Sequence, residues 1–423
     1  MGQSPQRISM KNHIFLFAIF ILMFVGNNIL YQVIGTPTSV FTTILPSCYI
    51  ITFVLLQNRC KPLEKGCKKK EELFLFVCWF LLLAMQLAMK SSGFLGNLID
   101  MLFLPITISY LYPENNEDFK TKVRKIIILF YCIDSIWSIG ERIIGKNIFP
   151  FTGNIEEENI IYSLEGFRSS ALQDHPLNNA LCLTAIIVFV LTSSYITLKK
   201  KLFLFFVGYM AILCFNTRSS MILWAIIMII FLIHFIFFTK KNVTFIIKLR
   251  FSIFILLLIP IIFSLINHYN LGDRLTSQKL LDDSALVRIL SLEMFLNSDF
   301  MSIFVGIPSE KIELLMYKSQ ILIIENFWII YFLKYGIIGF VLLLLGFYKL
   351  LKRIFKPYTK YRKIFCIVFF FLLASTNNSL AVYTTPLCLF ILCGYSFSEK
   401  GRKHPKLDIY RRDLSTSRIH EGS

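Results

Sequence analysis

The chain has 423 residues, of which 56% are hydrophobic and 17% are charged, and its formal net charge is +18. Soluble domains average ~45–50% apolar and ~25% charged residues, so this composition excludes a soluble globular protein. The ten cysteines form no Cys-x-x-Cys pair, which argues against a zinc site and against a disulfide framework.

Apolar segments of bilayer-spanning length follow one another along the chain. A helix of about 20 apolar residues crosses the hydrocarbon core, so the sequence predicts an all-α polytopic membrane protein with about 12 transmembrane helices. The whole chain, 1–423, forms one integral membrane domain in this interpretation. The predicted spans are 13–35, 39–57, 73–90, 94–112, 126–144, 176–197, 202–217, 220–238, 251–267, 325–350, 364–378 and 380–397. The span 202–217 is short and 220–238 follows it closely, so the boundaries of these two spans could be placed differently.

The basic residues gather in alternate connections between these spans. With the N-terminus in the cytoplasm, about three quarters of the 44 Lys and Arg residues fall on the cytoplasmic side, as the positive-inside rule requires. Both termini are then cytoplasmic, including a polar tail at 398–423. We interpret the positive charge as a topology signal with membrane lipids as its partner, and no nucleic-acid partner is needed to explain it.

Two connections on the external side are longer than the others. They lie at 145–175 and at 268–324, the second between the ninth and tenth spans. Long loops are uncommon unless they carry a function. The second loop is predicted to contain a helix, Ser284–Leu296, which Asp283 can cap and on which Arg288 lies. We therefore expect the functional residues on this side of the membrane.

Charged residues at the external ends of the spans are the candidates for chemistry, since the sequence has no Walker loop, HExxH or GxSxG motif. They are Arg168, Arg218, Arg288 and Glu325. Arginine binds phosphate bidentately and keeps its charge, so three arginines can hold a diphosphate leaving group without a metal ion. A carboxylate such as Glu325 can serve as the general base.

Each of these residues also has a structural interpretation. Arg168 and Arg218 could extend to lipid headgroups, and Arg288 could lie on a solvated helix face. Glu325 could be an ordinary interfacial carboxylate, and His175 fits a structural role better than a catalytic one.

Helix geometry offers one further argument for Glu325. It precedes Gly336 by about three helical turns, so a continuous helix places both on one face together with Gly339. Small residues on that face let another helix approach the carboxylate, although a Gly-x-x-Gly pair can also serve packing alone.

The loop residues resemble motifs of the O-antigen polymerase and O-antigen ligase superfamily of bacterial polysaccharide assembly. Arg288 and Leu292 match the family's Arg-x3-Leu motif in its large periplasmic loop. Glu325, Asn326 and Gly336 match its His-Asn-x9-Gly motif, except that Glu325 replaces the histidine. In the ligases that histidine activates the acceptor hydroxyl, so the replacement favours the polymerase branch.

Two upstream segments resemble the family's other arginine-bearing blocks. One contains Arg168 and the run from His175 to Asn178, and the other is the turn around Arg218. The resemblance covers positions from about 165 to 340 and agrees with the family's plan of about 12 spans. It implies a protein of the bacterial inner membrane with an active site that faces the periplasm.

The resemblance implies a metal-independent membrane glycosyltransferase that needs no cofactor. Its activity would be the polymerisation of undecaprenyl-diphosphate-linked repeat units into O-antigen, capsule or exopolysaccharide, with a chain-length regulator as a candidate partner. The implied site has Glu325 and Arg288 as catalytic residues, Arg168, Arg218 and Arg288 on the diphosphate, and His175 and Asn326 on the substrate.

Three other functions remain open. An O-antigen ligase would transfer finished polysaccharide to lipid A-core, and the absence of the histidine at position 325 disfavours it. A lipid-linked oligosaccharide flippase should place cations within its spans, whereas the predicted spans are nearly free of charge. A solute transporter typically shows inverted repeats and broken helices, and the sequence reveals neither.

Overall fold

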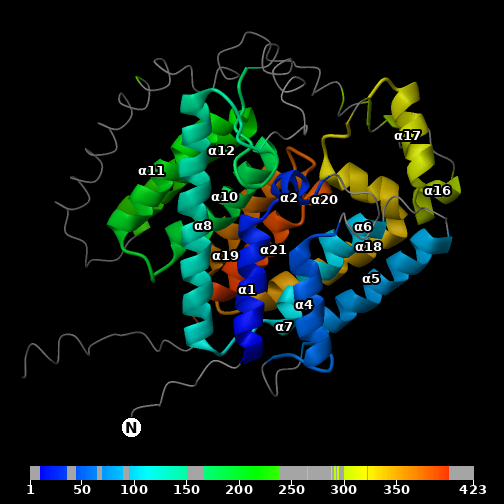
Figure 1. Ribbon diagram of the computed structural model, residues 1–423, viewed down its shortest axis with the longest axis horizontal. Helices are drawn as coiled ribbons and strands as arrows, with labels where there is room; N and C mark the ends of the chain where they lie inside the picture. The colour runs from blue at the N-terminus through cyan, green and yellow to red at the C-terminus, as the bar shows by residue number, and fades with distance from the viewer. Residues whose placement is uncertain are drawn as a thin grey trace, which may run out of the picture.

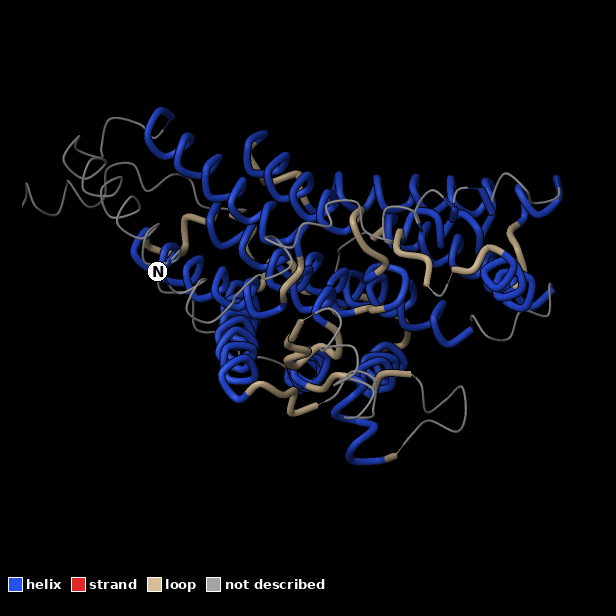
Figure 2. Tube along the Cα trace, turned by 90° about the horizontal axis from the view of Figure 1, so that it is seen from above, coloured by secondary structure: helices blue, strands red, loops and turns tan. Residues whose placement is uncertain are grey.

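The computed structural model is a bundle of helices (Figure 1). The structure describes residues 10–35, 44–63, 69–88, 95–149, 166–238, 264, 287, 290–291, 293–294, 300–321 and 323–399. Within these ranges all regular secondary structure is helical, which confirms the all-α class. Seen from above, loops and turns lie between the helices near the middle of the view (Figure 2).

The helices follow the apolar segments of the sequence. Their bounds in the first half are α1 Met10–Phe24, α2 Asn27–Ile34, α4 Pro46–Gln57, α5 Lys70–Ala88, α6 Leu95–Leu98, the π-helix η2 Ile99–Phe103, α7 Leu104–Leu111, α8 Glu117–Ile144 and α10 Pro176–Thr192. In the second half they are α11 Leu198–Phe215, α12 Arg218–Ile233, the π-helix η3 His234–Phe238, α16 Phe300–Val305, α17 Ser309–Lys318, α18 Phe327–Ile354, α19 Lys360–Ala374, α20 Ser379–Val382 and α21 Thr385–Ser396. The predicted pair 202–217 and 220–238 is thus two separate helices, whereas the predicted span 251–267 lies outside the described residues apart from Ser264.

Helices α10 and α21 form the centre of the bundle. Every residue of α21 is buried, and α10 is buried along nearly its whole length by α11, α19 and α21. A helix that is apolar on all sides belongs in a protein core or in a membrane, and these two helices are covered by their neighbours. Polar side chains there pair within the bundle, as where the indole nitrogen of Trp224 donates to the hydroxyl of Thr184 at 2.7 Å.

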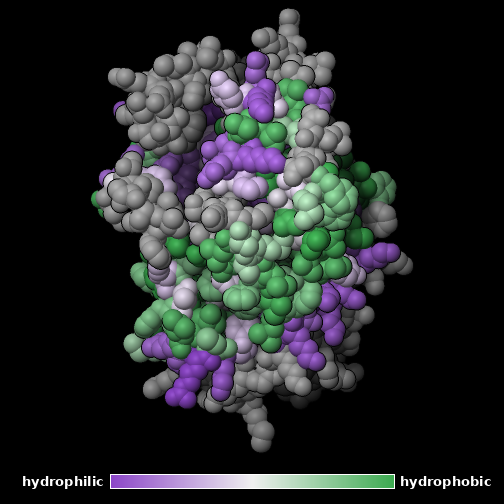
Figure 3. All heavy atoms as spheres, turned by 90° about the vertical axis from the view of Figure 1, so that its right-hand side faces the viewer, coloured by the Kyte–Doolittle hydropathy of each residue, from purple (hydrophilic) through white to green (hydrophobic). Residues whose placement is uncertain are grey.

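Several helices are suited to a membrane. Among the described residues, α5, α18 and the stretch Arg218–Phe237 are long and apolar enough to cross a bilayer, and the bent pair α1–α2 adds a fourth if it is one span. One face of the molecule shows a belt of hydrophobic side chains between hydrophilic regions above and below it (Figure 3). A helical membrane protein is therefore supported, and the count of 12 spans stays a prediction.

Predicted spans 13–35 and 325–350 are not continuous helices, and 380–397 is divided between α20 and α21. The segment 13–35 breaks between α1 and α2, which are bent by 90°, because the amides of Asn27 and Asn28 bind the carboxylate of Asp174 at 2.7 and 2.8 Å. A Cβ atom on Gly26 would collide with Asp174, so glycine permits this contact. This break is one that the sequence does not reveal, because it depends on a contact with a distant residue.

The second break lies in α18, at Gly336, whose φ of 62° and ψ of −177° are not helical. The residue lies against the backbone of Phe304 and Gly306, where a Cβ atom would not fit. Glu325 precedes the first residue of α18. The prediction that Glu325 and Gly336 share one face of a continuous helix is consequently wrong, because close backbone packing against α16 interrupts the helix.

Candidate functional site

Glu325 and Asn326 are held against a polar turn that follows α19. Asn326 caps α18, since its side-chain oxygen accepts from the amide of Trp328 at 2.9 Å, and its side-chain nitrogen donates to the carbonyl of Ser375 at 3.2 Å. The Phe327 amide donates to the carbonyl of Asn377 at 3.2 Å. Residues 375–378 therefore fix the place of Glu325, whose side chain is half-buried.

The same turn contacts the turn that carries Arg218. The hydroxyl of Thr376 donates to that of Ser219 at 3.0 Å. Arg218 is the first residue of α12 and follows Asn216, which ends α11 in the left-handed conformation with φ of 53°. Arg218 at the start of α12 and Glu325, two residues before α18, therefore lie on either side of residues 375–378.

The segment that carries Arg168 lies beside the Arg218 turn. The amide of Ser169 donates to the carbonyl of Cys214 at 3.1 Å, and the side chain of Asn216 donates to the carbonyl of Phe167 at 3.4 Å. The structure thus brings the backbone of three predicted site residues, Arg168, Arg218 and Glu325, together around residues 375–378.

A buried carboxylate on α8 holds the Arg168 segment in place. One oxygen of Glu141 accepts from the hydroxyl of Ser169 and from the amide of Ala171, the latter at 3.0 Å. Its other oxygen accepts from the indole of Trp137 and from the amide of Ile148, at 3.1 and 3.0 Å. This role is not evident from the sequence, because a glutamate near a helix end is ordinarily a surface residue.

His175 caps α10 and lies next to the same segment. Its Nδ1 accepts from the amide of Leu177 at 3.2 Å, and its ring stacks on that of Tyr383 with 6.1 Å between centroids. Burial, together with the nearby charge of Arg168, lowers the pKa of His175 to about 3. The imidazole is therefore neutral and carries its proton on Nε2, so His175 can donate a hydrogen bond but cannot act as a cation.

Arg288 lies outside the described residues, and its side chain is not part of this geometry. Its described neighbours Val287 and Leu290 pack against an apolar cluster that includes Ile324 and Leu333. Val287 and Leu290 therefore lie in one cluster with the residue that precedes Glu325.

The turn 375–378 is the part of the site that the sequence analysis missed. It was assigned to the end of a span at 364–378, which is wrong, since α19 ends at Ala374. The available signal was the run of five consecutive polar residues from Ser375 to Ser379 between two apolar segments. Such a run cannot remain inside hydrocarbon without partners.

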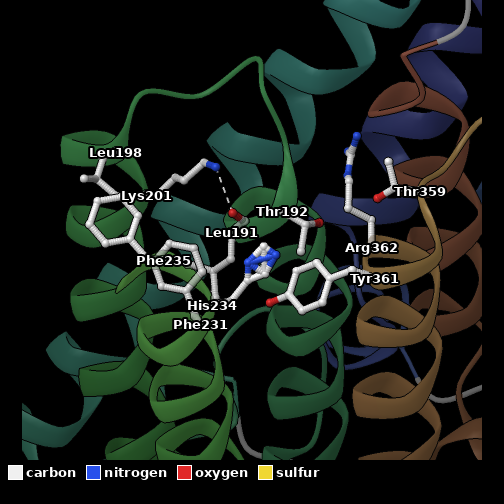
Figure 4. Close-up of a pocket in the computed structure, with 10 residues that line it drawn as sticks. All are labelled: Leu191, Thr192, Leu198, Lys201, Phe231, His234, Phe235, Thr359, Tyr361 and Arg362. Carbon is white, nitrogen blue, oxygen red and sulfur yellow. Dashed lines mark hydrogen bonds between the residues drawn. The ribbon is translucent and has the colours of Figure 1, made fainter. Parts of the chain in front are cut away.

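No group of three His, Cys, Asp or Glu side chains that could hold a metal ion occurs within the described parts of the chain. A cavity lined by Lys201, His234 and Arg362 lies at the other end of the bundle and contains none of the predicted site residues (Figure 4). The sequence matches no protein-family model and no curated protein.

Proposed function

We propose that the protein polymerises undecaprenyl-diphosphate-linked oligosaccharide repeat units by glycosyl transfer at the external face of the membrane. The observation that carries the proposal is the meeting of the Arg168, Arg218 and Glu325 segments around residues 375–378. Two cations and one carboxylate at the border of an apolar bundle suit a lipid-linked diphosphate donor and a hydroxyl acceptor.

The proposed reaction is a displacement at the anomeric carbon of the donor sugar. The acceptor hydroxyl oxygen forms the new bond to that carbon while the bond from the carbon to the diphosphate oxygen breaks. Glu325 takes the hydroxyl proton, and undecaprenyl diphosphate leaves with the bonding electron pair. Arg168, Arg218 and Arg288 lower the energy of the departing anion, which is often the largest catalytic contribution.

His175 and Asn326 have supporting roles in this scheme. Neutral His175 donates from Nε2 to a sugar or phosphate oxygen. Asn326 uses one acceptor and one donor within the protein, so it chiefly positions Glu325 and retains one N–H for substrate.

Complementation of a deletion strain tests the proposal, with surface glycan resolved on a gel. Wild-type protein should restore a ladder of chain lengths, and Glu325→Gln should leave core with a single repeat unit. Glu313→Gln, an exposed glutamate on α17, is the matched control and should restore the ladder. A full ladder from Glu325→Gln at equal protein level would remove Glu325 as the base.

Transport of the lipid-linked oligosaccharide is the second candidate, because α18 is broken at Gly336 and α1–α2 is bent by 90°. Transporters often bind substrate where helices are discontinuous. The same deletion strain separates the two, since loss of a flippase leaves lipid-linked repeat units on the cytoplasmic side. Bare core with repeat units accumulated outside would instead indicate a ligase.

A further inference from the structure

The cavity at the end of the bundle opposite the candidate site has a volume of about 380 Å³. It lies among the ends of α10 and α12 and the beginnings of α11 and α19, with Lys201 and Arg362 on opposite sides and His234 between them (Figure 4). Ligand pockets commonly have volumes of ~300–1,000 Å³. This end carries Lys199–Lys201 and is the predicted cytoplasmic side.

Two helix N-termini face this cavity without a cap. Thr197 precedes α11 and Thr359 precedes α19, and neither threonine side chain accepts a hydrogen bond from its helix. Neither first turn contains an acidic residue, and residues of both first turns line the cavity. The unpaired amides and the helix dipole at an N-terminus favour an anion. Both first turns here carry basic side chains instead of an acidic one, which adds to this attraction.

The cationic side chains in the wall are only partly neutralised. Arg362 is 8% exposed; it pairs with Glu399 at 2.6 Å and donates to the carbonyl of Phe397, yet its buried Nε has no partner. The buried hydroxyl of Tyr361 also has no hydrogen-bond partner. Lys201 donates to the carbonyl of Leu191 at 2.8 Å. Buried polar atoms without partners are rare in proteins and point to a ligand that supplies acceptors.

The other half of the cavity wall is apolar. Phe231, Phe235, Leu191 and Leu198 form it, and all four lie on helices that extend into the bundle. The ligand that fits both halves has an anionic head and an acyl chain. We propose that this cavity binds the phosphate of an anionic phospholipid from the cytoplasmic leaflet, between the N-termini of α11 and α19. Basic pockets between membrane helices are suited to such headgroups.

Thermal unfolding of the purified full-length protein in detergent tests the site, with added phosphatidylglycerol, phosphatidylcholine or inorganic phosphate. Phosphatidylglycerol should raise the unfolding temperature at lower concentration than phosphatidylcholine, and inorganic phosphate alone should have little effect. Equal effects of both lipids would overturn the proposal. Equal stabilisation by inorganic phosphate would overturn the lipid assignment, because it would identify a soluble anion as the ligand.

Removing either cation should weaken the phosphatidylglycerol response. Lys201→Gln and Arg362→Gln should each raise the lipid concentration for half-maximal stabilisation roughly fivefold, since one basic residue near an anionic headgroup contributes about 1 kcal/mol. Lys356→Gln is the control and should behave as wild type. It also removes one positive charge, but Lys356 is exposed and lies outside the cavity lining. An unchanged response in both cavity variants would overturn the proposal.

Thr359→Asp separates loss of the site from loss of folding. The aspartate supplies both the missing cap of α19 and an anion at the place of the phosphate. The variant should therefore unfold at a higher temperature than wild type without lipid and lose the phosphatidylglycerol response. A full lipid response in this stabilised variant would contradict a site at the α19 N-terminus.

Discussion

The two ends of the bundle use their acidic residues differently. At the predicted cytoplasmic end, Arg353 pairs with both Glu72 and Glu114, and Lys69 pairs with Glu114 at 3.3 Å. At the opposite end, the carboxylates of Glu141 and Asp174 accept hydrogen bonds from backbone amides and neutral side chains. Neither of these two pairs with a basic side chain in the part of the chain that the structure describes.

The ion pairs at the predicted cytoplasmic end have a structural role, whereas the carboxylates at the opposite end position the proposed functional site. Ion pairs at the cytoplasmic end join α5, α18 and the residues after α7 into one frame. At the other end, Glu141 and Asp174 fix the loops that carry Arg168 and His175 through backbone amides and neutral side chains. Four changes, taken from the largest expected effect to the smallest, test this comparison.

Arg353→Met should have the largest effect on folding. Glu72 is fully buried, and removal of one partner of a buried ion pair typically costs ~3–5 kcal/mol, since the other charge stays uncompensated. We expect little folded protein in the membrane, measured by fluorescence-detected size-exclusion chromatography. The adjacent exposed Lys352→Met should be nearly neutral, and equal yields of the two variants would contradict a structural role for these ion pairs.

Gly336→Ala tests the break in α18 at the opposite end. Alanine at a positive φ, with its Cβ against the backbone of Phe304 and Gly306, should cost ~3 kcal/mol and separate α16 from α18. Gly140→Ala in α8 is the control, because nothing lies within 4 Å of its new Cβ. That change should stabilise by about 0.5–1 kcal/mol, so thermal unfolding should show opposite signs for the two glycines.

Glu141→Gln tests whether a carboxylate positions Arg168. The amide can turn its NH₂ group toward the rotatable hydroxyl of Ser169, but the Ala171 amide then loses its acceptor, at a cost of ~1–3 kcal/mol. Polymer yield should fall further than the amount of folded protein. Asp118→Asn lies on the same helix with an exposed side chain, and should change neither quantity. Normal polymer from Glu141→Gln would leave it a purely structural residue.

Hydropathy was enough to predict where most helices lie, and it failed where a tertiary contact decides the backbone. The bend after α1 depends on Asp174, which lies far away in the sequence, and the break at Gly336 depends on α16. No local pattern contains either partner. The large loop could be located from its polarity, but its docking on α18 through Ile307, Ile312 and Leu333 is seen only in the structure.

The candidate site was predictable in the same limited sense. Alternation of the spans placed Arg168, Arg218 and Glu325 on one side, and the structure brings their segments together. The alternation of the spans could not predict that residues 375–378 form part of the site, because hydropathy assigns this turn to the end of an apolar run. Nor could the sequence predict the role of Glu141. Only the folded structure shows that its carboxylate is buried and accepts hydrogen bonds from four donors.

Asp174 provides the smallest and most specific test of the acids at the external end. Burial raises its pKa to about 6, although the Asn28 and Asn27 amides partly oppose the shift. Between pH ~4 and ~6 the folded state therefore binds a proton that the unfolded state has lost, so stability falls as the pH rises, by at most ~1.4 kcal/mol per pH unit. Thermal unfolding measured across this window should show that slope in wild type and in Asp118→Asn, whose exposed carboxyl begins α8. Asp174→Asn should reduce the slope by up to this amount, because the amide does not titrate; a slope as steep in Asp174→Asn as in wild type would mean that Asp174 is ionised throughout this window.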